Sequence, residues 1–382
     1  MNVTIELFKF YDLGGPLSRL EIVNTLDNIE VSYGSMSRYQ VDTDKNEPDY
    51  INYPEPIALS INTKANDNIS STASNGGSEK NGRANWVERS DEIECKIYTY
   101  GALSLKTKLY IEIDDINGLS DYLNHNDPYD DIEKMFDDIF TEIFEVFQGR
   151  LDQEYRTDNF TTLYPVYCIS DTGYQDVSKL IAANRTEITA LLSGIYDKRD
   201  FSETQIKNVM QVWTRFYKGD YSIVHWNATL AVDNDNDFSD ILFIIELANI
   251  QFLKLRAYDD YIDNYLSEYM DKSHDKFTHK FDFLFPGNRK MLNEITKMRV
   301  EIEQITDMMN NFEKFFGRWY LAKIYYLASS AFEITRWRNL IASRLDTVDE
   351  IYTMLHEEKN RKKMLLLNFL TFLLFILWFV IG

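Results

Sequence analysis

Acidic residues at 233–237 have a spacing that could bind a metal ion. Asp233, Asp235 and Asp237 alternate as in the opening of a calcium-binding loop. The sixth position is Phe238 where such a loop needs Gly, and the twelfth is Ile244 where a bidentate Glu belongs. The carboxylates are better explained as the negatively charged first turn of a helix that starts near residue 240, because acids stabilise a helix N-terminus.

A second cluster contains both histidines of a polar segment. His274 and His279 are five residues apart, beside Asp271, Asp275 and Asp282. Imidazole and carboxylate groups can bind zinc, but a solvated connection between helices explains this segment better. The sequence motifs of nucleotide, hydrolase and zinc-protease sites are missing. We therefore expect no catalytic residue, no cofactor and no metal, and a protein that is not an enzyme.

A row of polar residues in a predicted long helix is the strongest candidate interaction site. Glu246, Asn249, Arg256 and Asp260 follow one another at helical spacing, and Asp259 lies one step around the helix. One interpretation is a surface ion pair from Arg256 to Asp260. The other is a half-buried polar network that fixes how this helix meets the sheet or a partner subunit. The sequence alone leaves both open.

Alternating apolar residues predict strands across the N-terminal half, residues 1–235. Helical spacing between them indicates an α+β body with a mixed, mostly antiparallel sheet. The predicted strands cover 3–10, 57–61, 92–113 with a turn near Gly101, 161–169 and 221–232, and the predicted helices cover 18–26, 130–151 and 177–192. Residues 64–85 are rich in Asn, Ser and Gly, which predicts a flexible insertion.

Beyond residue 235 the strand pattern ends. Apolar residues recur at intervals of three and four in the segments 240–270, 288–316 and 336 onward, which predicts long helices. Their heptad-like spacing predicts an antiparallel helical bundle or coiled coil over residues 236–363. This region would form a stalk that holds copies of the chain together.

Residues 364–382 contain no charged side chain. As a helix they would reach roughly 28 Å, about the thickness of a bilayer's hydrocarbon core, so we expect one C-terminal transmembrane anchor. Asn368 and Thr371 are its polar residues and lie on one side with Trp378, where Asn368 could contact another copy. A helix buried in an oligomer core is the alternative. Basic residues before the segment favour a cytoplasmic body: Lys359, Arg361, Lys362 and Lys363.

Composition narrows the class of partner. The 382-residue chain has a net charge of -21, which argues against a nucleic-acid surface. Its two cysteines, Cys95 and Cys168, form no CxxC pair and indicate a reducing compartment. Residues 1–20 lack a basic region followed by an apolar one, so we expect no secretory signal.

Two segments carry a family resemblance: IVHWNATLAV at 223–232 and IELANIQFLKLRAYD at 245–259. They resemble the "required for meiotic nuclear division" (sporulation protein) family, and residues 337–352 are similar to the helix before that family's anchor. The resemblance, over roughly residues 220–382, implies an α+β body, a helical region and a hydrophobic C-terminal segment. The chain departs in the anchor, where Asn368, Thr371 and aromatic residues replace an Ile/Leu-rich run. The resemblance implies anchoring and assembly, with no catalytic residue to carry over.

Together these features predict a membrane-anchored, non-enzymatic structural or interaction protein. It would cross the lipid bilayer once with its body facing the cytoplasm, form homo-oligomers through its stalk, and present its acidic α+β domain to a protein partner. An alternative is an oligomeric pore or ion-channel component with a plan similar to CorA-type magnesium transporters, whose Gly-Met-Asn signature is missing here. An enzyme acting near the membrane is a third class.

Overall fold

The computed structural model describes residues 1–15, 17–26, 31–39, 56–63, 84–126, 128–147, 160–196, 201–275, 299–300 and 319–381. The chain divides into two compact units. The first combines Met1–Ala257 with Gln304–Thr335, and the second combines Tyr258–Glu303 with Arg336–Gly382. The predicted insertion at 64–85 and the predicted helix at 288–316 lie almost entirely outside the described residues.

The first unit contains a ten-stranded sheet with helices. Its strands are β1 (Asn2–Asp12), β2 (Ser35–Tyr39), β3 (Ile57–Asn62), β4 (Ala84–Arg89), β5 (Glu92–Tyr98), β6 (Ala102–Ile113), β7 (Thr161–Ser170), β8 (Trp213–Thr214), β9 (Asp220–Val224) and β10 (Thr229–Asp233). Its helices are α1 (Arg19–Leu26), α2 (Ile116–His125), α3 (Asp130–Phe147), α4 (Ser178–Ala183), α5 (Arg185–Ser193), α6 (Glu203–Val209) and α9 (Trp319–Ala331). Two further helices, α7 (Ser239–Asp275) and α10 (Ile334–Ile381), begin in the first unit and continue into the second.

The sheet is mixed and mostly antiparallel. Its strand order is β2-β3-β5-β6-β1-β7-β10-β9-β8, and β4 pairs with the last residues of β6. β10 runs parallel to β7, whereas the other pairs are antiparallel. The strand predicted over 221–232 is instead the hairpin β9–β10, since the chain turns between Val224 and Thr229. The N-terminal mixed sheet with helices is therefore present.

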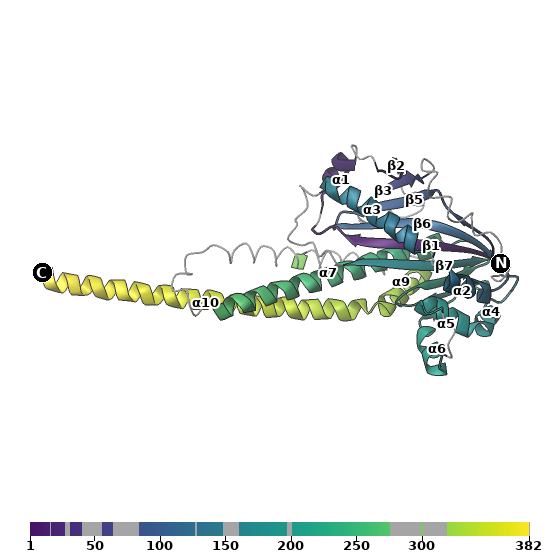
Figure 1. Ribbon diagram of the computed structural model, residues 1–382. Coiled ribbons are helices and arrows are strands. Elements are labelled where there is room, and N and C mark those ends of the chain that lie inside the picture. The colour runs from purple at the N-terminus through teal and green to yellow at the C-terminus, as the bar shows by residue number, and fades with distance from the viewer. Residues whose placement is uncertain are drawn as a thin grey trace. The chain divides into compact units, whose positions relative to one another are not determined.

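β1 lies in the middle of this sheet and is buried on both faces. Successive side chains of a strand point to opposite faces. Val3, Ile5 and Leu7 accordingly join an apolar core with residues of α2, α3 and α5. Glu6 and Phe8, equally buried, point to the other face. Figure 1 shows α3 and α7 on opposite faces of the sheet.

The prediction of a helical bundle or coiled coil over residues 236–363 is wrong. A coiled-coil helix buries one narrow stripe, but every residue of α7 from Ile244 to Leu255 is buried. A helix buried all round lies in the core of its domain, and the same intervals of three and four apolar residues arise there without a coiled-coil partner. Within the described residues there is no three-helix bundle.

The prediction of a transmembrane helix at residues 364–382 is also contradicted by the structure. These residues, as far as Ile381, form the end of α10, a single helix of 48 residues. Searching the described parts of the chain finds no helix with the length and apolarity needed to cross a membrane. Among the described side chains from Met364 to Leu374, Asn368 and Thr371 are polar, which lowers the apolarity of this end of the helix. The predicted anchor and the single-pass, cytoplasm-facing membrane localisation are therefore not supported.

Gly101 lies in the turn between β5 and β6, and its close approach to the backbone of Gly15 can be tested by substitution. Its φ is +77°, and a Cβ atom there would lie 2.3 Å from the carbonyl oxygen of Gly15. Gly173 has a similar φ of +73° but open space around it. We expect both Gly→Ala variants to lose about 1–2 kcal/mol of unfolding free energy from the left-handed backbone. Gly101→Ala should lose at least about 2 kcal/mol more, because backbone atoms must move. Urea unfolding measures both; equal losses would contradict the close packing.

Candidate functional site

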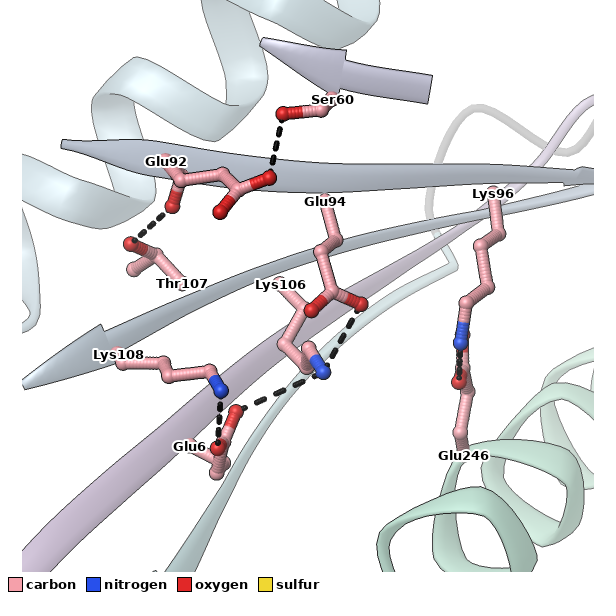
Figure 2. Close-up of polar contacts among 9 residues, drawn as sticks. All are labelled: Glu6, Ser60, Glu92, Glu94, Lys96, Lys106, Thr107, Lys108 and Glu246. Carbon is pink, nitrogen blue, oxygen red and sulfur yellow. Dashed lines mark hydrogen bonds and ion pairs between the residues drawn. The ribbon is translucent and has the colours of Figure 1, made fainter. Parts of the chain in front are cut away.

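Charged side chains line the face of the sheet opposite the apolar core. We call this group the polar layer; its members are Glu6 of β1, Glu94 and Lys96 of β5, Lys106 and Lys108 of β6, and Glu246 of α7. The antiparallel register brings them together, because Glu6 lies opposite Lys108 and Glu94 lies opposite Lys106. Figure 2 shows two groups of these side chains: Lys108, Glu6, Lys106 and Glu94 are linked along the strands, and Lys96 pairs separately with Glu246 of α7.

Lys106 is the centre of the polar layer. Its Nζ lies 2.9 Å from Oε2 of Glu94 and 3.7 Å from Oε2 of Glu6. Lys108 approaches the other oxygen of Glu6, at 3.3 Å. Glu6 is buried, so its charge needs both lysines, since a buried carboxylate is costly unless it is paired.

Glu246 joins α7 to the sheet. Lys96 Nζ donates a hydrogen bond to Oε2 of Glu246 at 2.6 Å, and the Glu246 side chain is only 3% exposed (Figure 2). The neighbouring polar atoms Ser104 Oγ and Asn249 Oδ1 are buried without a hydrogen-bond partner in the described structure. The charge-assisted hydrogen bond between Lys96 and Glu246 ties one position of the helix to one position of the sheet.

A second ion pair joins the two elements farther along. Lys254 Nζ lies 2.7 Å from Oδ1 of Asp12 and donates another hydrogen bond, also of 2.7 Å, to the carbonyl of Gly14. Both charged side chains are 1% exposed. Asp12 ends β1, and its Oδ1 also accepts the backbone N–H of Gly14, at 3.2 Å. Lys254 therefore holds α7 against the end of the central strand.

The opposite face of β1 carries a matching contact to α3. Lys9 Nζ lies between Glu133 at 2.8 Å and Asp137 at 2.7 Å. The hydroxyl of Tyr11 donates to Asp137 at 2.9 Å. Burial, with the negative charge of Asp137 beside it, raises the pKa of Tyr11, so the phenol stays protonated and can donate. Both large faces of β1 are thus tied to a helix by a buried lysine.

Electrostatics in the polar layer favour stable ion pairs over proton transfer. Burial opposes the charge on Glu94, but Lys106 and Lys96 outweigh it and lower the pKa of that carboxyl. Burial likewise opposes the charge on Lys106, but Glu6 and Glu94 raise the pKa of its ammonium group. Both pKa values therefore shift away from pH 7, whereas a general acid or base works best with a pKa near the operating pH.

The polar residues singled out in the 240–260 segment do not form one network. Glu246 reaches the sheet, and the amide of Asn249 donates to the carbonyl of Ile245 in its own helix, at 2.9 Å. Arg256 stacks on the rings of two phenylalanines. In the second unit, Asp259 pairs with Arg344 at 3.2 Å. Asp260 accepts a hydrogen bond from Asn264 at 2.9 Å.

The residues predicted for an anchor lie in α10. Asn368 and Thr371 are exposed, and the Thr371 hydroxyl donates to the carbonyls of Leu367 at 3.0 Å and Asn368 at 2.9 Å. The side chain of Arg361 is exposed. The side chains of the remaining predicted residues lie outside the described part of the structure: Lys359, Lys362, Lys363 and Trp378.

The acidic residues considered as a calcium site lie just before the start of α7. Asp233 accepts the N–H of Asp235 at 2.8 Å, and Asp237 accepts the Ser239 hydroxyl at 2.7 Å, so these carboxylates stabilise the turn into α7. No cluster of His, Cys, Asp or Glu in the described residues could hold a metal ion. The His274 side chain and all of His279 lie outside that part.

Sequence reasoning missed most of the polar layer. In β5 and β6 charged residues alternate with apolar ones, as on any strand with one solvated face. For the separate ion pair of Lys254, a weak signal was available: it is a single lysine within the mostly apolar segment that forms the buried part of α7. A lysine in such a position requires a buried acid, but nothing local indicates Asp12, which lies 242 residues away.

Comparison with known proteins assigns this chain to a family. The family model described as "Uncharacterized protein MJ0711, N-terminal domain" matches residues 27–239. This chain belongs to that family. It is 23% identical, over 268 residues, to the uncharacterized protein MJ0711 of Methanocaldococcus jannaschii, which covers 70% of this chain and 74% of that relative. No solved structure matches. These comparisons do not test the resemblance to the meiotic nuclear division family, which stays a prediction.

The ion pair between Lys96 and Glu246 can be tested by a double-mutant cycle. Lys96→Met and Glu246→Gln each leave a largely buried partner without its counter-charge, so each should destabilise the protein. We expect a coupling energy of about 1–3 kcal/mol between them, because the pair is desolvated. Lys134–Asp130, whose side chains are 67% and 62% exposed, is the control pair and should show much weaker coupling. Additive effects at Lys96 and Glu246 would contradict the contact.

The lowered pKa of Glu94 predicts an acid-sensitive fold. Its ordinary pKa is 4.5 and its folded value is lower, so its contribution to stability is complete above about pH 4.5 and is lost as the pH falls through the folded value. Glu94→Gln should lower stability at pH 7 and make its decline below pH 4.5 shallower. Glu112→Gln, at an exposed site in β6, is the control. Urea midpoints from pH 7 to 2.5 measure both; parallel curves for wild type and Glu94→Gln would exclude this role.

Proposed function

We propose that this chain is a non-enzymatic interaction protein that self-associates through the C-terminal part of α10 and presents its acidic α+β body to other proteins. The observation that carries this proposal is the exposed apolar surface at the end of α10. The polar layer supports the non-enzymatic part, because its acids and lysines neutralise one another in a structural role.

α10 has one apolar segment that the chain itself covers and another that is exposed. Ile341, Leu345 and Val348 are buried. Lys359 and Lys362 interrupt the seven-residue repeat. Beyond them the same spacing falls on four exposed side chains: Leu366 (53% exposed), Phe369 (63%), Leu373 (42%) and Ile376 (46%). An exposed apolar surface of this extent marks an interaction site.

A second copy of the chain is the occupant that fits best. Apolar side chains are exposed on the other sides of the helix too, including Leu367, Leu370 and Leu374. A groove on an unrelated protein covers one side of a helix, whereas several like helices can cover all of them. A patch that meets its own copy also needs no separate complementary surface. The net charge of -21 makes the bodies repel, so the attraction must come from this apolar segment.

Self-association is tested on the full-length chain by gel filtration with light scattering. We expect an oligomer that becomes monomeric when Phe369 and Leu373 are both replaced by Glu, because burying two carboxylates between helices is prohibitive. Disulfide crosslinking then locates the contact. Leu373→Cys should crosslink several-fold more than Glu112→Cys, at an exposed site in β6, and the two native cysteines are buried.

Three results would overturn the proposal. The first is a wild-type chain that is monomeric at micromolar concentration. The second is an oligomer that survives the double Glu substitution, because the contact would then lie elsewhere. The third is a monomer that sediments with phosphatidylcholine vesicles, in which case lipid and not a second copy covers the helix.

A further inference from the structure

Arg256 is a half-buried cation held by aromatic rings. Its Cζ lies 4.7 Å from the ring centroid of Phe160 and 5.3 Å from that of Phe252. The ring of Trp226 meets Phe252 edge-on, with 4.8 Å between centroids, and is 42% exposed. A guanidinium on aromatic faces has its position set by cation–π contact, while its N–H groups at the edge of the plane stay available to an acceptor.

No acid of this chain neutralises Arg256 within the described structure. It makes no ion pair or hydrogen bond with a described residue, and Asp260, one turn farther along α7, accepts a hydrogen bond from Asn264. Burial lowers the pKa of Arg256, and no carboxylate among the described residues opposes that change. The buried lysines Lys9 and Lys254 differ in this respect, because each contacts a carboxylate.

We propose that Arg256, with Trp226, Phe160 and Phe252, binds the carboxylate of a ligand that also carries an apolar group. The guanidinium would take the carboxylate through two parallel hydrogen bonds, and the exposed Trp226 ring would pack on the apolar part. One guanidinium neutralises one negative charge, and the net charge of -21 disfavours a dianion such as phosphate. The inference is independent of self-association through α10.

The test uses the full-length chain and the fluorescence of its tryptophans. 3-Phenylpropionate is the probe, and 3-phenylpropionamide, which has the same apolar body without the charge, is its matched control. We expect the acid to bind at least tenfold more tightly than the amide. Arg256→Lys keeps the charge but loses the planar donor pair and should weaken acid binding at least tenfold. Trp226→Phe should abolish the fluorescence change, which assigns the signal among six tryptophans.

A second arm separates the sources of such a carboxylate. A tripeptide ending in Phe is compared with its C-terminal amide and with 3-phenylpropionate. Tighter binding of the peptide acid would indicate the end of a protein chain as the ligand, and equal binding of the two acids would indicate a small carboxylic acid. Equal binding of acid and amide, or unchanged binding by a folded Arg256→Lys variant, would overturn the proposal, as would tighter binding of inorganic phosphate.

Discussion

A strand buried on both faces can carry charge only where each charge meets a partner, and this constraint organises the first unit. β1 contains Glu6, Lys9 and Asp12, all buried. An unpaired ion in such a position would cost several kcal/mol. Each of the three therefore requires a counter-charge from a neighbouring strand or from a helix packed on the sheet, and the elements that supply these charges are held in place.

The partners come from distant parts of the chain. Lys9 takes its acids from α3, Asp12 takes its lysine from α7, and Glu6 takes its lysines from β6. An apolar surface alone would permit a helix to slide along the sheet, since hydrophobic contact has no direction. The two ion pairs of α7, one at Lys96 and one at Lys254, specify its position along the sheet.

The family match and the fold have different boundaries. The family model begins at residue 27 and ends at residue 239, where α7 begins. The central strand β1 and nearly all of the helix α7 lie outside it. Asp12 of β1 and Lys254 of α7 nevertheless form one of the two ion pairs that hold α7 on one face of the sheet. The matched region thus contributes most strands, while the elements that complete its core come from either side.

The sequence by itself determined the local elements, because strand and helix periods are written in neighbouring residues. The strand at 3–10, the turn at Gly101, the helix starting at Asp130 and the mixed sheet could all be predicted. Only the tertiary structure decided which polar face is solvated. Glu94, Lys96 and Lys106 have the alternation of an exposed strand face, yet Lys96 pairs with Glu246 of α7 and Lys106 pairs with Glu94 and Glu6 within the sheet.

Helical spacing was ambiguous for the same reason. Apolar residues at intervals of three and four are typical of a coiled-coil seam and also occur in a helix surrounded by its own domain. The distinction depends on what packs against the remaining sides, which no single segment records. Ion pairs such as Asp12–Lys254 join residues 242 positions apart. Their partners are fixed by strand order and helix placement, and these exist only once the chain has folded.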